Sequence, residues 1–197
     1  MKRLRAPLTE NAVQSLRVGD EILIDGYIYA ARDAAHKRMI EAIVLGQDLP
    51  FDPRGQIIYY VGPCPAPPGK VIGSAGPTTS GRMDAYTPAL LERGLRGMIG
   101  KGDRSQAVVE AMQRFGAVYL AAVGGAGVYL AERIVSAQTV AYPELGPEAL
   151  LRLEVRSFPC IVAIDSYGDN IYQEVRNRVN SQYYKEEEND QNKRPAQ

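Results

Sequence analysis

The sequence predicts an α/β fold in a single domain, because short apolar segments with strand character alternate with segments of helical periodicity. The chain has 197 residues, of which 45% are apolar, so it is long enough to bury a hydrophobic core of its own. We expect residues 1–182 to form this domain. Residues 183–197 carry almost no apolar side chains, which predicts a disordered polar tail.

Hydrophobic patterning and turn residues give the expected order of the elements. We expect strands at residues 21–24, 27–29, 57–61, 95–99, 117–123, 139–142 and 161–164. We expect helices at residues 34–45, 87–93, 104–115, 128–134 and 147–151.

In the first half of the chain, each element is bounded by characteristic residues. Asp25-Gly26 predicts a turn between the first two strands. Arg32-Asp33 opens the first helix, and Gly46 stands where a C-terminal stop is expected. The proline-rich run 62–69 is expected to be a rigid connector. Arg32 should therefore lie at a strand-to-helix junction, where free backbone N–H groups and the helix dipole attract anions.

In the second half, the helix signals are clearer than the strand signals. Thr87-Pro88 is a favourable helix start, with threonine as the N-cap and proline in the first position, and Gly94 is its stop. Asp103 or Ser105 can cap the next helix, whose apolar positions share one face before Gly116. Shorter elements then complete the alternation of strands and helices.

Composition excludes several functional classes. The 23 basic and 23 acidic residues cancel, so no broad electrostatic field favours nucleic acid or acidic membranes. No apolar run reaches the length of a signal peptide or a transmembrane helix, so we expect a cytoplasmic protein.

Cys64 and Cys160 are too few for a disulfide framework, and we expect both to be structural. His36 has no partner at ligand spacing, so we expect no metal site and place it on a helix surface or behind the site.

Two glycine-rich stretches do not fit known nucleotide motifs. The stretch from Gly94 to Lys101 lacks P-loop spacing, and Gly102 stands where serine or threonine is required. Gly125-Ala126-Gly127 begins like a dinucleotide fingerprint, but Leu130 replaces its third glycine. We interpret this second stretch as either tight packing or a backbone contact with a ligand.

The strongest functional signal is the loop Ser74-Ala75-Gly76-Pro77-Thr78-Thr79-Ser80-Gly81-Arg82-Met83-Asp84, followed by Ile99-Gly100-Lys101-Gly102-Asp103-Arg104. Together they place hydroxyls, an arginine and a lysine on backbone made flexible by glycine, as in loops that grip a small anion. Arg32 adds a second arginine, and two such forks suit a small dicarboxylate better than a phosphomonoester or a neutral sugar. The competing interpretation is that these cations are ordinary solvated surface charges.

These two segments, with Ala31-Arg32-Asp33-Ala34-Ala35-His36-Lys37-Arg38 ahead of them, resemble the β subunit or C-terminal domain of the iron-sulfur hydro-lyases, the family of class I fumarate hydratase and L(+)-tartrate dehydratase. The resemblance continues through Gly124-Gly125-Ala126, Glu144-Leu145-Gly146-Pro147-Glu148-Ala149, Phe158-Pro159 and Ile164-Asp165-Ser166-Tyr167-Gly168-Asp169. It implies a swivelling β/β/α domain with a mixed sheet or barrel flanked by helices. It also implies an enzyme, a hydro-lyase that is active only with an α subunit.

The resemblance also implies roles for individual residues. Thr78 is the base that takes a proton from the substrate, and Lys101 completes the pocket. Asp33 is a further catalytic candidate, although its position favours a helix cap or an orienting partner for an arginine. Ala30 departs from the family pattern, which commonly has threonine there, and this loss of a hydroxyl is expected to alter substrate fit without changing the class. The residues expected to bind substrate are Arg32, Arg82, Thr79 and Gly76.

The resemblance further implies a [4Fe-4S] cluster held by an α partner chain, because two cysteines are too few to bind it here. It favours hydration of fumarate to (S)-malate, with L-tartrate as the alternative and a mesaconate-type substrate also open. An α2β2 heterotetramer fits family habit. Two other classes stay open: a non-catalytic dicarboxylate-binding module, and a metal-independent lyase or isomerase that uses Thr78 and Lys101 alone.

Overall fold

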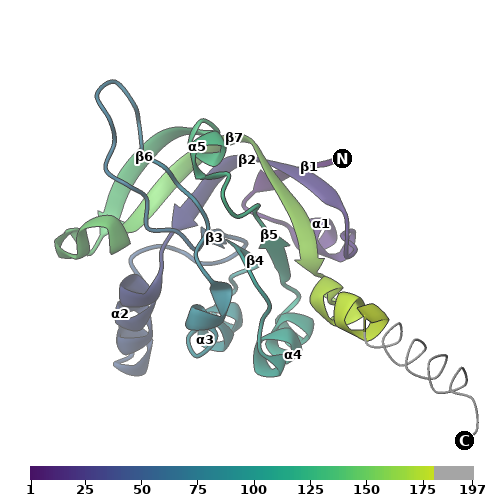
Figure 1. Ribbon diagram of the computed structural model, residues 1–197. Helices are drawn as coiled ribbons and strands as arrows, with labels where there is room; N and C mark the ends of the chain where they lie inside the picture. The colour runs from purple at the N-terminus through teal and green to yellow at the C-terminus, as the bar shows by residue number, and fades with distance from the viewer. Residues whose placement is uncertain (180–197) are drawn as a thin grey trace, which may run out of the picture.

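A closed β-sheet forms the centre of the molecule (Figure 1). The computed structural model describes residues 1–179, and within them seven strands hydrogen-bond in the order β1-β2-β3-β4-β5-β7-β6. A further pairing between β2 and β7 closes β2, β3, β4, β5 and β7 into a barrel. Helices flank this barrel, so the predicted α/β class with a mixed barrel is confirmed. The predicted tail, residues 183–197, lies outside the described residues.

The strands run in two directions. The parallel strands are β1 (Lys2–Ala6), β2 (Glu21–Ala30), β3 (Ile57–Tyr59), β4 (Gly97–Gly100) and β5 (Val118–Ala121). Strand β7 (Leu150–Ile164) runs against them and pairs with β2 along one edge. Its other edge pairs first with β6 (Ile134–Ala141) and then with β5. The length of β7 therefore lets one strand close the barrel and extend the sheet.

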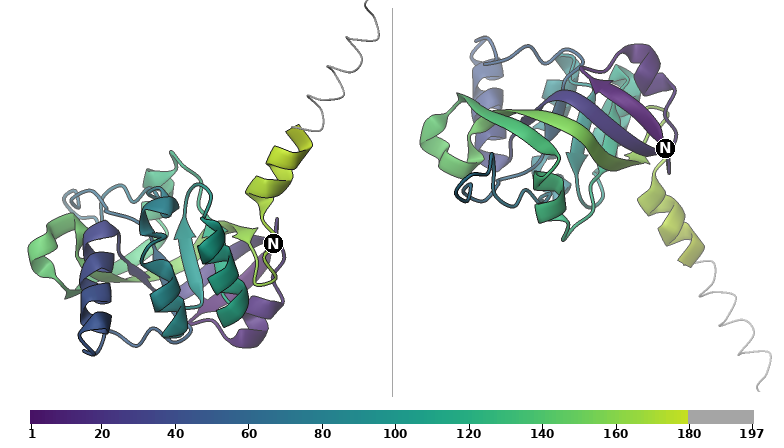
Figure 2. Two further views of the ribbon diagram at one scale, coloured as in Figure 1. Left: turned by 90° about the horizontal axis from the view of Figure 1, so that it is seen from below. Right: turned by 90° about the horizontal axis from the view of Figure 1, so that it is seen from above.

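Helices α2 (Asp33–Val44), α3 (Thr87–Glu92) and α4 (Gln106–Phe115) lie side by side on one face of the parallel strands (Figure 1; Figure 2, left). The other helical elements are α1 (Glu10–Gln14), η1 (Ser80–Met83), α5 (Gly127–Ala131), η2 (Pro143–Glu148) and residues 171–179. Among residues 1–179, no helix is long and apolar enough to cross a membrane.

Two apolar clusters pack against opposite faces of the parallel strands, because successive side chains of a strand point to opposite faces. Ile57 and Tyr59 belong to the cluster inside the barrel, and the ring of Tyr59 meets that of Phe158 edge to face at 5.2 Å. Ile58 and Tyr60 belong to the cluster that helices α2, α3 and α4 cover. A strand buried on both faces has a continuous apolar run, which is why residues 57–61 predict a buried strand.

The turn predicted at Asp25-Gly26 is wrong, because β2 runs unbroken through both residues. The register between β2 and β7 shifts between Ile24 and Gly26, and the extra residue of this bulge lies in β7, where Ser157 has a φ of +48°. Gly26 has a φ of +106°, and a Cβ there would lie 2.8 Å from the carbonyl oxygen of Ala6 in β1. The Asp25 carboxylate accepts a hydrogen bond from the Ser157 amide at 2.8 Å. Residues typical of a turn therefore lie inside a long strand, opposite a bulge in its partner strand.

The helix expected at residues 147–151 and the separate strand expected at 161–164 are also wrong. The helical turn η2 ends at Glu148, and β7 already begins at Leu150. Pro159 masks this strand in the sequence, because proline cannot donate a ladder hydrogen bond and is rare inside strands. Strand β6 likewise begins at Ile134, where the sequence predicts the end of a helix.

The ends of α2 and α4 and the start of α3 can be compared with the capping residues expected from the sequence. Gly46 and Gly116 follow their helices with φ of +68° and +64°, so both predicted stops are confirmed. Thr87 is not the N-cap: it is the first residue of α3, and its hydroxyl donates to the Met83 carbonyl at 2.9 Å. Strand β1 and helix α1 have no counterpart in the sequence expectations, because five residues are too few to show a period.

We expect Gly127→Ala to destabilise the chain by roughly 1–3 kcal/mol through overpacking. A Cβ at Gly127 would lie 2.5 Å from Ser74 Oγ and 2.9 Å from the backbone nitrogen of Gly76, which cannot move aside as a side chain can. Gly124→Ala is the matched control, because only Lys101 Cδ, at 3.8 Å, lies near its new Cβ. Thermal unfolding checks the pair, and equal melting temperatures would contradict the expectation.

Candidate active site

Four chain segments converge where the parallel strands end. Arg32 follows β2, Lys101 follows β4, and the turn 123–127 follows β5. The arm (residues 62–73) leaves β3, folds back through hydrogen bonds between Cys64 and Ser74 and between Gly73 and Cys64, and delivers residues 74–80 to the same edge (Figure 1). Ligand sites of α/β sheets form at this edge, because the loops that follow neighbouring strands converge there.

A short parallel bridge between Thr79 and Lys101 joins two of these segments. The Lys101 amide donates to the Thr78 carbonyl at 3.2 Å, and the Ser80 amide donates to the Lys101 carbonyl at 2.9 Å. On the other side, the Thr78 amide donates to the Tyr60 carbonyl at 2.8 Å. The structure therefore brings Thr78, Thr79 and Lys101 together, as the sequence motifs predict.

The two arginines of the site share one carboxylate. Arg32 Nε donates to Asp33 Oδ2 at 3.1 Å, and Arg82 Nε, from η1, donates to Asp33 Oδ1 at 2.8 Å. Partial burial alone would raise the pKa of Asp33. Hydrogen bonds from its own amide and from Arg32, with the charges of Arg82 and Arg32, outweigh burial and hold this pKa below its usual value. Asp33 is thus ionised at neutral pH and orients both arginines.

Glu148 is a site residue that no sequence motif identified. Its Oε2 accepts a hydrogen bond from the Ala34 amide at 3.1 Å, in the first turn of α2, and its Oε1 lies 3.4 Å from Arg32 Nη2. Gly62 makes room for this arginine, because a Cβ there would lie 2.8 Å from Arg32 Cδ. The segment 144–149 was notable only as part of the family resemblance, and no local signal indicates that its last glutamate reaches the site.

Positive charge is available at this edge. Lys101 is exposed, and within residues 1–179 no carboxylate pairs with its ammonium group. Among these described residues, Arg82 pairs with Asp33 only through Nε, and 49% of its side chain is exposed, so its terminal nitrogens are open to a ligand. Three cations against the carboxylates of Asp33 and Glu148 leave one net positive charge. The arrangement can therefore bind a small anion through forked and point-charge contacts.

The small residues of the site allow close packing of backbone. The Ala75 amide donates to the Gly127 carbonyl at 3.0 Å, and a Cβ at Gly76 would lie 3.6 Å from Gly127 Cα. Gly76, expected to bind substrate, thus lies where the loop meets α5. Ser80 is buried, and Gly100 accommodates it, because a Cβ at Gly100 would lie 1.9 Å from Ser80 Oγ. Of the two interpretations of Gly125-Ala126-Gly127, tight packing fits the contacts of Gly127.

His36 is not on a helix surface, which corrects one of the two placements expected from the sequence. It is fully buried in α2, its Nδ1 lies 3.0 Å from the Arg32 carbonyl oxygen, and its ring meets that of Tyr60 edge to face at 5.3 Å. Burial is the main cause that lowers the pKa of His36 to about 4, and the charge of Arg104 lowers it further. His36 is therefore neutral at pH 7 and lies directly behind Arg32.

A groove of about 430 Å³ lies between the arm and α5, but it is not part of the cationic site. Its walls come from residues 67–74, from Val128 and Ala131 of α5, and from Ile134 at the start of β6. Neither arginine of the site lines it, and Lys101 does not line it either. We assign the site from the convergence of charged side chains, because an anion needs those groups more than it needs a deep apolar cavity.

Comparison with known proteins agrees with this geometry. The family model described as Fumarase C-terminus matches residues 2–175. The chain belongs to this family. It is 40% identical over 178 residues to a putative L(+)-tartrate dehydratase subunit beta of Methanocaldococcus jannaschii, a match that covers 87% of this chain and 91% of that protein. It is 38% identical over 180 residues to the anaerobic class I fumarate hydratase of Escherichia coli (strain K12), covering 90% of this chain and 32% of that protein.

A fumarate hydratase 2 of Leishmania major is also 38% identical, over 157 residues, which cover 79% of this chain and 28% of that protein. The chain thus spans about a third of the length of the fumarate hydratases it matches. It spans nearly the whole of the archaeal subunit beta. Members of this family therefore occur both as one segment of a longer chain and as a protein of this length.

The residues of this chain do not fit the [4Fe-4S] cluster that the family resemblance implies. Such clusters are held mainly by cysteine thiolates. Cys64 is exposed on the arm, and Cys160 is buried in β7, where burial raises the pKa of its thiol. Within the part of the chain that the structure describes, no group of three or more His, Cys, Asp or Glu side chains could hold a metal ion.

Titration of His36 should make the stability of the fold depend on pH. The pKa of its ring is about 4 in the folded chain and 6.5 when unperturbed, so the unfolded chain binds the proton more tightly. The full contribution is present above pH 6.5 and is lost as the pH falls towards 4, by about 2 kcal/mol at pH 5. Urea unfolding at pH 7.5 and pH 5 measures the loss. His36→Gln should be less stable at pH 7.5 but lose less on acidification, and an equal loss in both proteins would refute this assignment.

Glu148→Gln should bind small dianions more tightly. The variant keeps an oxygen for the Ala34 amide but removes the negative charge beside Arg32, so the affinity for succinate should rise about two- to fivefold at low ionic strength. Glu144→Gln is the control, because Glu144 lies in the same helical turn but pairs with Arg38, at 3.2 Å. Calorimetric titration of succinate into the full chain measures both. Weaker binding by Glu148→Gln than by the wild type would mean that Glu148 holds Arg32 in its binding position.

Proposed function

We propose that this chain is the β-type part of a hydro-lyase that reversibly adds water to a small dicarboxylate, with fumarate and (S)-malate as the leading pair. One observation carries the proposal. In a member of the fumarase family, Thr78 and Lys101 are joined by backbone pairing at the strand ends where Arg32 and Arg82 share Asp33. A hydroxyl, an ammonium group and two guanidinium groups at one edge suit this chemistry.

The cations supply substrate binding. A dicarboxylate carries two negative charges, and the forked guanidinium of arginine can hold a carboxylate through two parallel hydrogen bonds. Arg82 is the main candidate, because its terminal nitrogens are not used by Asp33. Arg32 is more heavily engaged, with Asp33 on Nε and Glu148 on Nη2, so it acts mainly as a fixed positive charge. Thr79 and Gly76 would line the bound substrate.

Thr78 is the proposed base. In the dehydration direction, a proton leaves the carbon next to the one that carries the hydroxyl, and a side chain at hydrogen-bond distance must accept it. A threonine hydroxyl is a weak base. A neutral hydroxyl that accepts a proton becomes positively charged, so Thr78 can serve as the base only as an alkoxide. The Lys101 ammonium, which pairs with no carboxylate among residues 1–179 and is joined to Thr78 through the backbone, is the group that would stabilise the negative charge of this alkoxide. Asp33, ionised and bound to both arginines, has the role of an orienting group in this scheme rather than that of an acid.

The proposal includes an α partner that brings the [4Fe-4S] cluster and further active-site groups. Three observations support it: the name of the archaeal relative contains subunit beta, the fumarate hydratases are about three times the length of this chain, and the described residues offer no group of three or more metal ligands. The exposed, incomplete character of the cationic edge fits a site that a second chain would close. The proposed assembly is an α2β2 heterotetramer, inactive when this chain is alone.

L-Tartrate is the second candidate substrate. The observation that favours it is the archaeal protein matched over 91% of its length, whose name assigns it to L(+)-tartrate dehydratase. Both substrates are short dicarboxylates, and a mesaconate-type substrate shares the same groups. The contacts that distinguish them would come from side chains around Thr79 and from the α partner.

The test is an anaerobic assay of fumarate and L-tartrate conversion, with this chain alone and with its α partner after reconstitution of the cluster. Activity should appear only in the reconstituted pair. Thr78→Ala should lower kcat by roughly 10²- to 10⁴-fold, as expected for loss of a general base. Thr78→Ser should retain more activity because it keeps a hydroxyl. Thr139→Ala, an exposed threonine of β6, serves as the control.

Each remaining outcome has a defined meaning. Activity of the chain alone in air would contradict the need for a partner and favour a metal-independent lyase. Binding of fumarate without turnover in any sample would favour a non-catalytic dicarboxylate-binding module. Full activity of Thr78→Ala in the reconstituted pair would leave the hydro-lyase in place and remove Thr78 as its base.

A further inference from the structure

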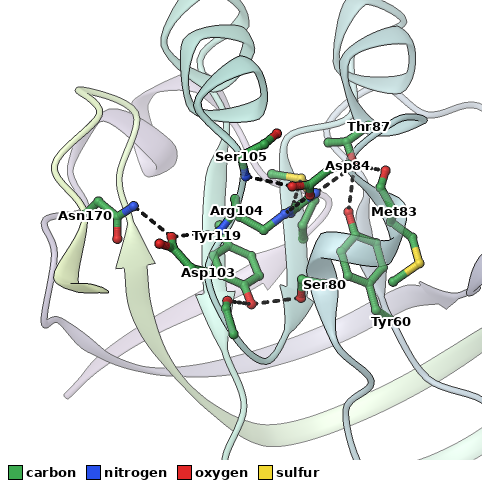
Figure 3. A network of polar contacts seen from close by, with 12 residues as sticks. Tyr60, Ser80, Met83, Asp84, Thr87, Asp103, Arg104, Ser105, Tyr119 and Asn170 are labelled. Atoms are coloured by element: carbon green, nitrogen blue, oxygen red, sulfur yellow. Dashed lines mark hydrogen bonds and ion pairs between the residues drawn. The ribbon is translucent and has the colours of Figure 1, made fainter. Parts of the chain in front are cut away.

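A buried arginine lies directly behind the site. The side chain of Arg104 has no solvent exposure, and Figure 3 shows it at the centre of a network of polar contacts between η1 and the start of α4. We call this set the Arg104 network; its members are Tyr60, Ser80, Met83, Asp84, Thr87, Arg104, Ser105 and Tyr119. None of these residues was assigned a role in the chemistry above.

Arg104 uses several faces of its guanidinium group at once. Nε donates to Asp84 Oδ1 at 2.7 Å, and Nη2 donates to Thr87 Oγ1 at 2.8 Å (Figure 3). The guanidinium carbon also lies over the rings of Tyr60 and Tyr119, 5.3 and 5.1 Å from their centroids. A fully buried charge is costly unless it is paired and hydrogen-bonded, and here both conditions are met.

Asp84 extends this contact to both segments. It follows η1, two residues after Arg82, and its second oxygen accepts a hydrogen bond from the Ser105 amide at 2.7 Å, just before α4. Thr87 in turn donates to the Met83 carbonyl at 2.9 Å, which ties the same arginine to the end of η1. One guanidinium and one carboxylate therefore fix the C-terminal end of η1 to the N-terminal end of α4.

Tyr119 makes a second connection between the same two segments. Its hydroxyl donates to the Gly102 carbonyl at 2.8 Å and so accepts from Ser80 Oγ, also at 2.8 Å. Gly102 directly follows Lys101, and Ser80 directly follows Thr79. The Arg104 network thus reaches both sides of the bridge between Thr79 and Lys101 from behind, through the buried side chains of Ser80 and Tyr119.

We propose that Arg104 is a positioning residue: its buried guanidinium sets the distance and angle between residues 78–84 and residues 101–105, and thereby places Thr78 and Arg82 relative to Lys101. The kinetic test of this inference rests on the proposed function, whereas the hydrogen-exchange test does not. The two segments are joined at the bridge in front, through the Tyr119 hydroxyl, and through Arg104 and Asp84 behind. Attachments at separated points restrain rotation, which a single bridge does not.

Arginine and lysine differ in what they can hold at this position. A lysine ammonium would still neutralise Asp84, but it is a point charge and cannot also donate in the plane to Thr87 while stacking over two rings. If Arg104 only neutralised a buried carboxylate, Arg104→Lys would be tolerated. If it positions the two segments, Arg104→Lys should loosen them although the charge is kept.

The experiment compares Arg104→Lys with the wild type in two measurements on the full chain. The first is hydrogen exchange at the Ser80 and Lys101 amides, which form the bridge and should exchange at least tenfold faster in the variant. The second is kinetics of the reconstituted pair, where kcat should fall roughly 10- to 100-fold, as expected for catalytic groups misplaced by about 1 Å. KM should change less than kcat, because Arg82 stays bound to Asp33.

Two control variants separate positioning from general effects. Arg114→Lys makes the same substitution on α4 at an exposed arginine that stacks on Phe115, and it should match the wild type. Met112→Ala opens a cavity in the buried face of α4 and destabilises the fold, but the Met112 side chain makes none of the hydrogen bonds of the network. Met112→Ala and Arg104→Lys are each measured at the same number of degrees below their own melting temperature.

The outcomes decide the proposal. Faster exchange at the bridge with reduced kcat in Arg104→Lys alone supports it. Equal effects in Met112→Ala would mean that Arg104 only stabilises the fold, which would overturn the proposal. Faster exchange with unchanged kcat in an active pair would also overturn it. If the wild-type pair is inactive on every dicarboxylate, the proposed function fails, and exchange at Ser80 and Lys101 alone then supports or overturns the positioning role.

Discussion

Backbone hydrogen bonds around the Thr79–Lys101 bridge are the constraint on which the site depends. Residues 74–80 arrive from a long arm, and they would have no fixed place without the donors and acceptors that Tyr60 and Lys101 offer at the strand ends. Because these bonds use only backbone atoms, the hydroxyls of Thr78 and Thr79 and the ammonium of Lys101 are not consumed in building the structure. The sheet edge is satisfied, and the side chains stay free for a ligand.

The charged side chains of the site also fall into two groups, those paired within the fold and those that a ligand can reach. Asp33 and Glu148 form ion pairs with Arg32, and Asp84 forms one with Arg104, so these two guanidinium groups are already paired. Lys101 and the outer nitrogens of Arg82 lie at the surface. Positive charge is therefore concentrated where solvent or a ligand can reach it, and the cations further inside serve to keep the loops in place.

Local patterns predicted the alternation of strands and helices and the helix stops at Gly46 and Gly116. A strand buried on both faces has a continuous apolar run, and a helix that ends in the left-handed conformation commonly has glycine there, so both features can be recognised in the sequence. The same patterns mispredicted Asp25-Gly26 and Pro159, where residues typical of turns and breaks are tolerated by a bulge and by the pairing of β7. Tertiary hydrogen bonding decided these positions, and a single sequence does not contain that information.

The candidate site shows the same limit. Arg32, Thr78, Arg82 and Lys101 could be singled out from residue type, loop composition and family resemblance. Glu148 could not, because its partner Ala34 lies 114 positions away and joins it only when η2 packs on α2. Arg104 is the last residue of the second segment that indicated the site, the one that contains Lys101. Its burial and its contact with Asp84, however, follow from the packing of α4 against η1, which no spacing rule describes.

The closure of the barrel has a consequence for how the chain acquires its fold. Strand β2 is made early in the sequence, but its long edge pairs with β7, so contacts such as that between Asp25 and Ser157 span 132 positions. Closing so large a loop is entropically unfavourable until other contacts reward it, which makes this pairing a late step and the fold a slow one to form. During synthesis, the half of the chain that carries Arg32 must wait with an unpaired strand edge until residues 150–164 emerge.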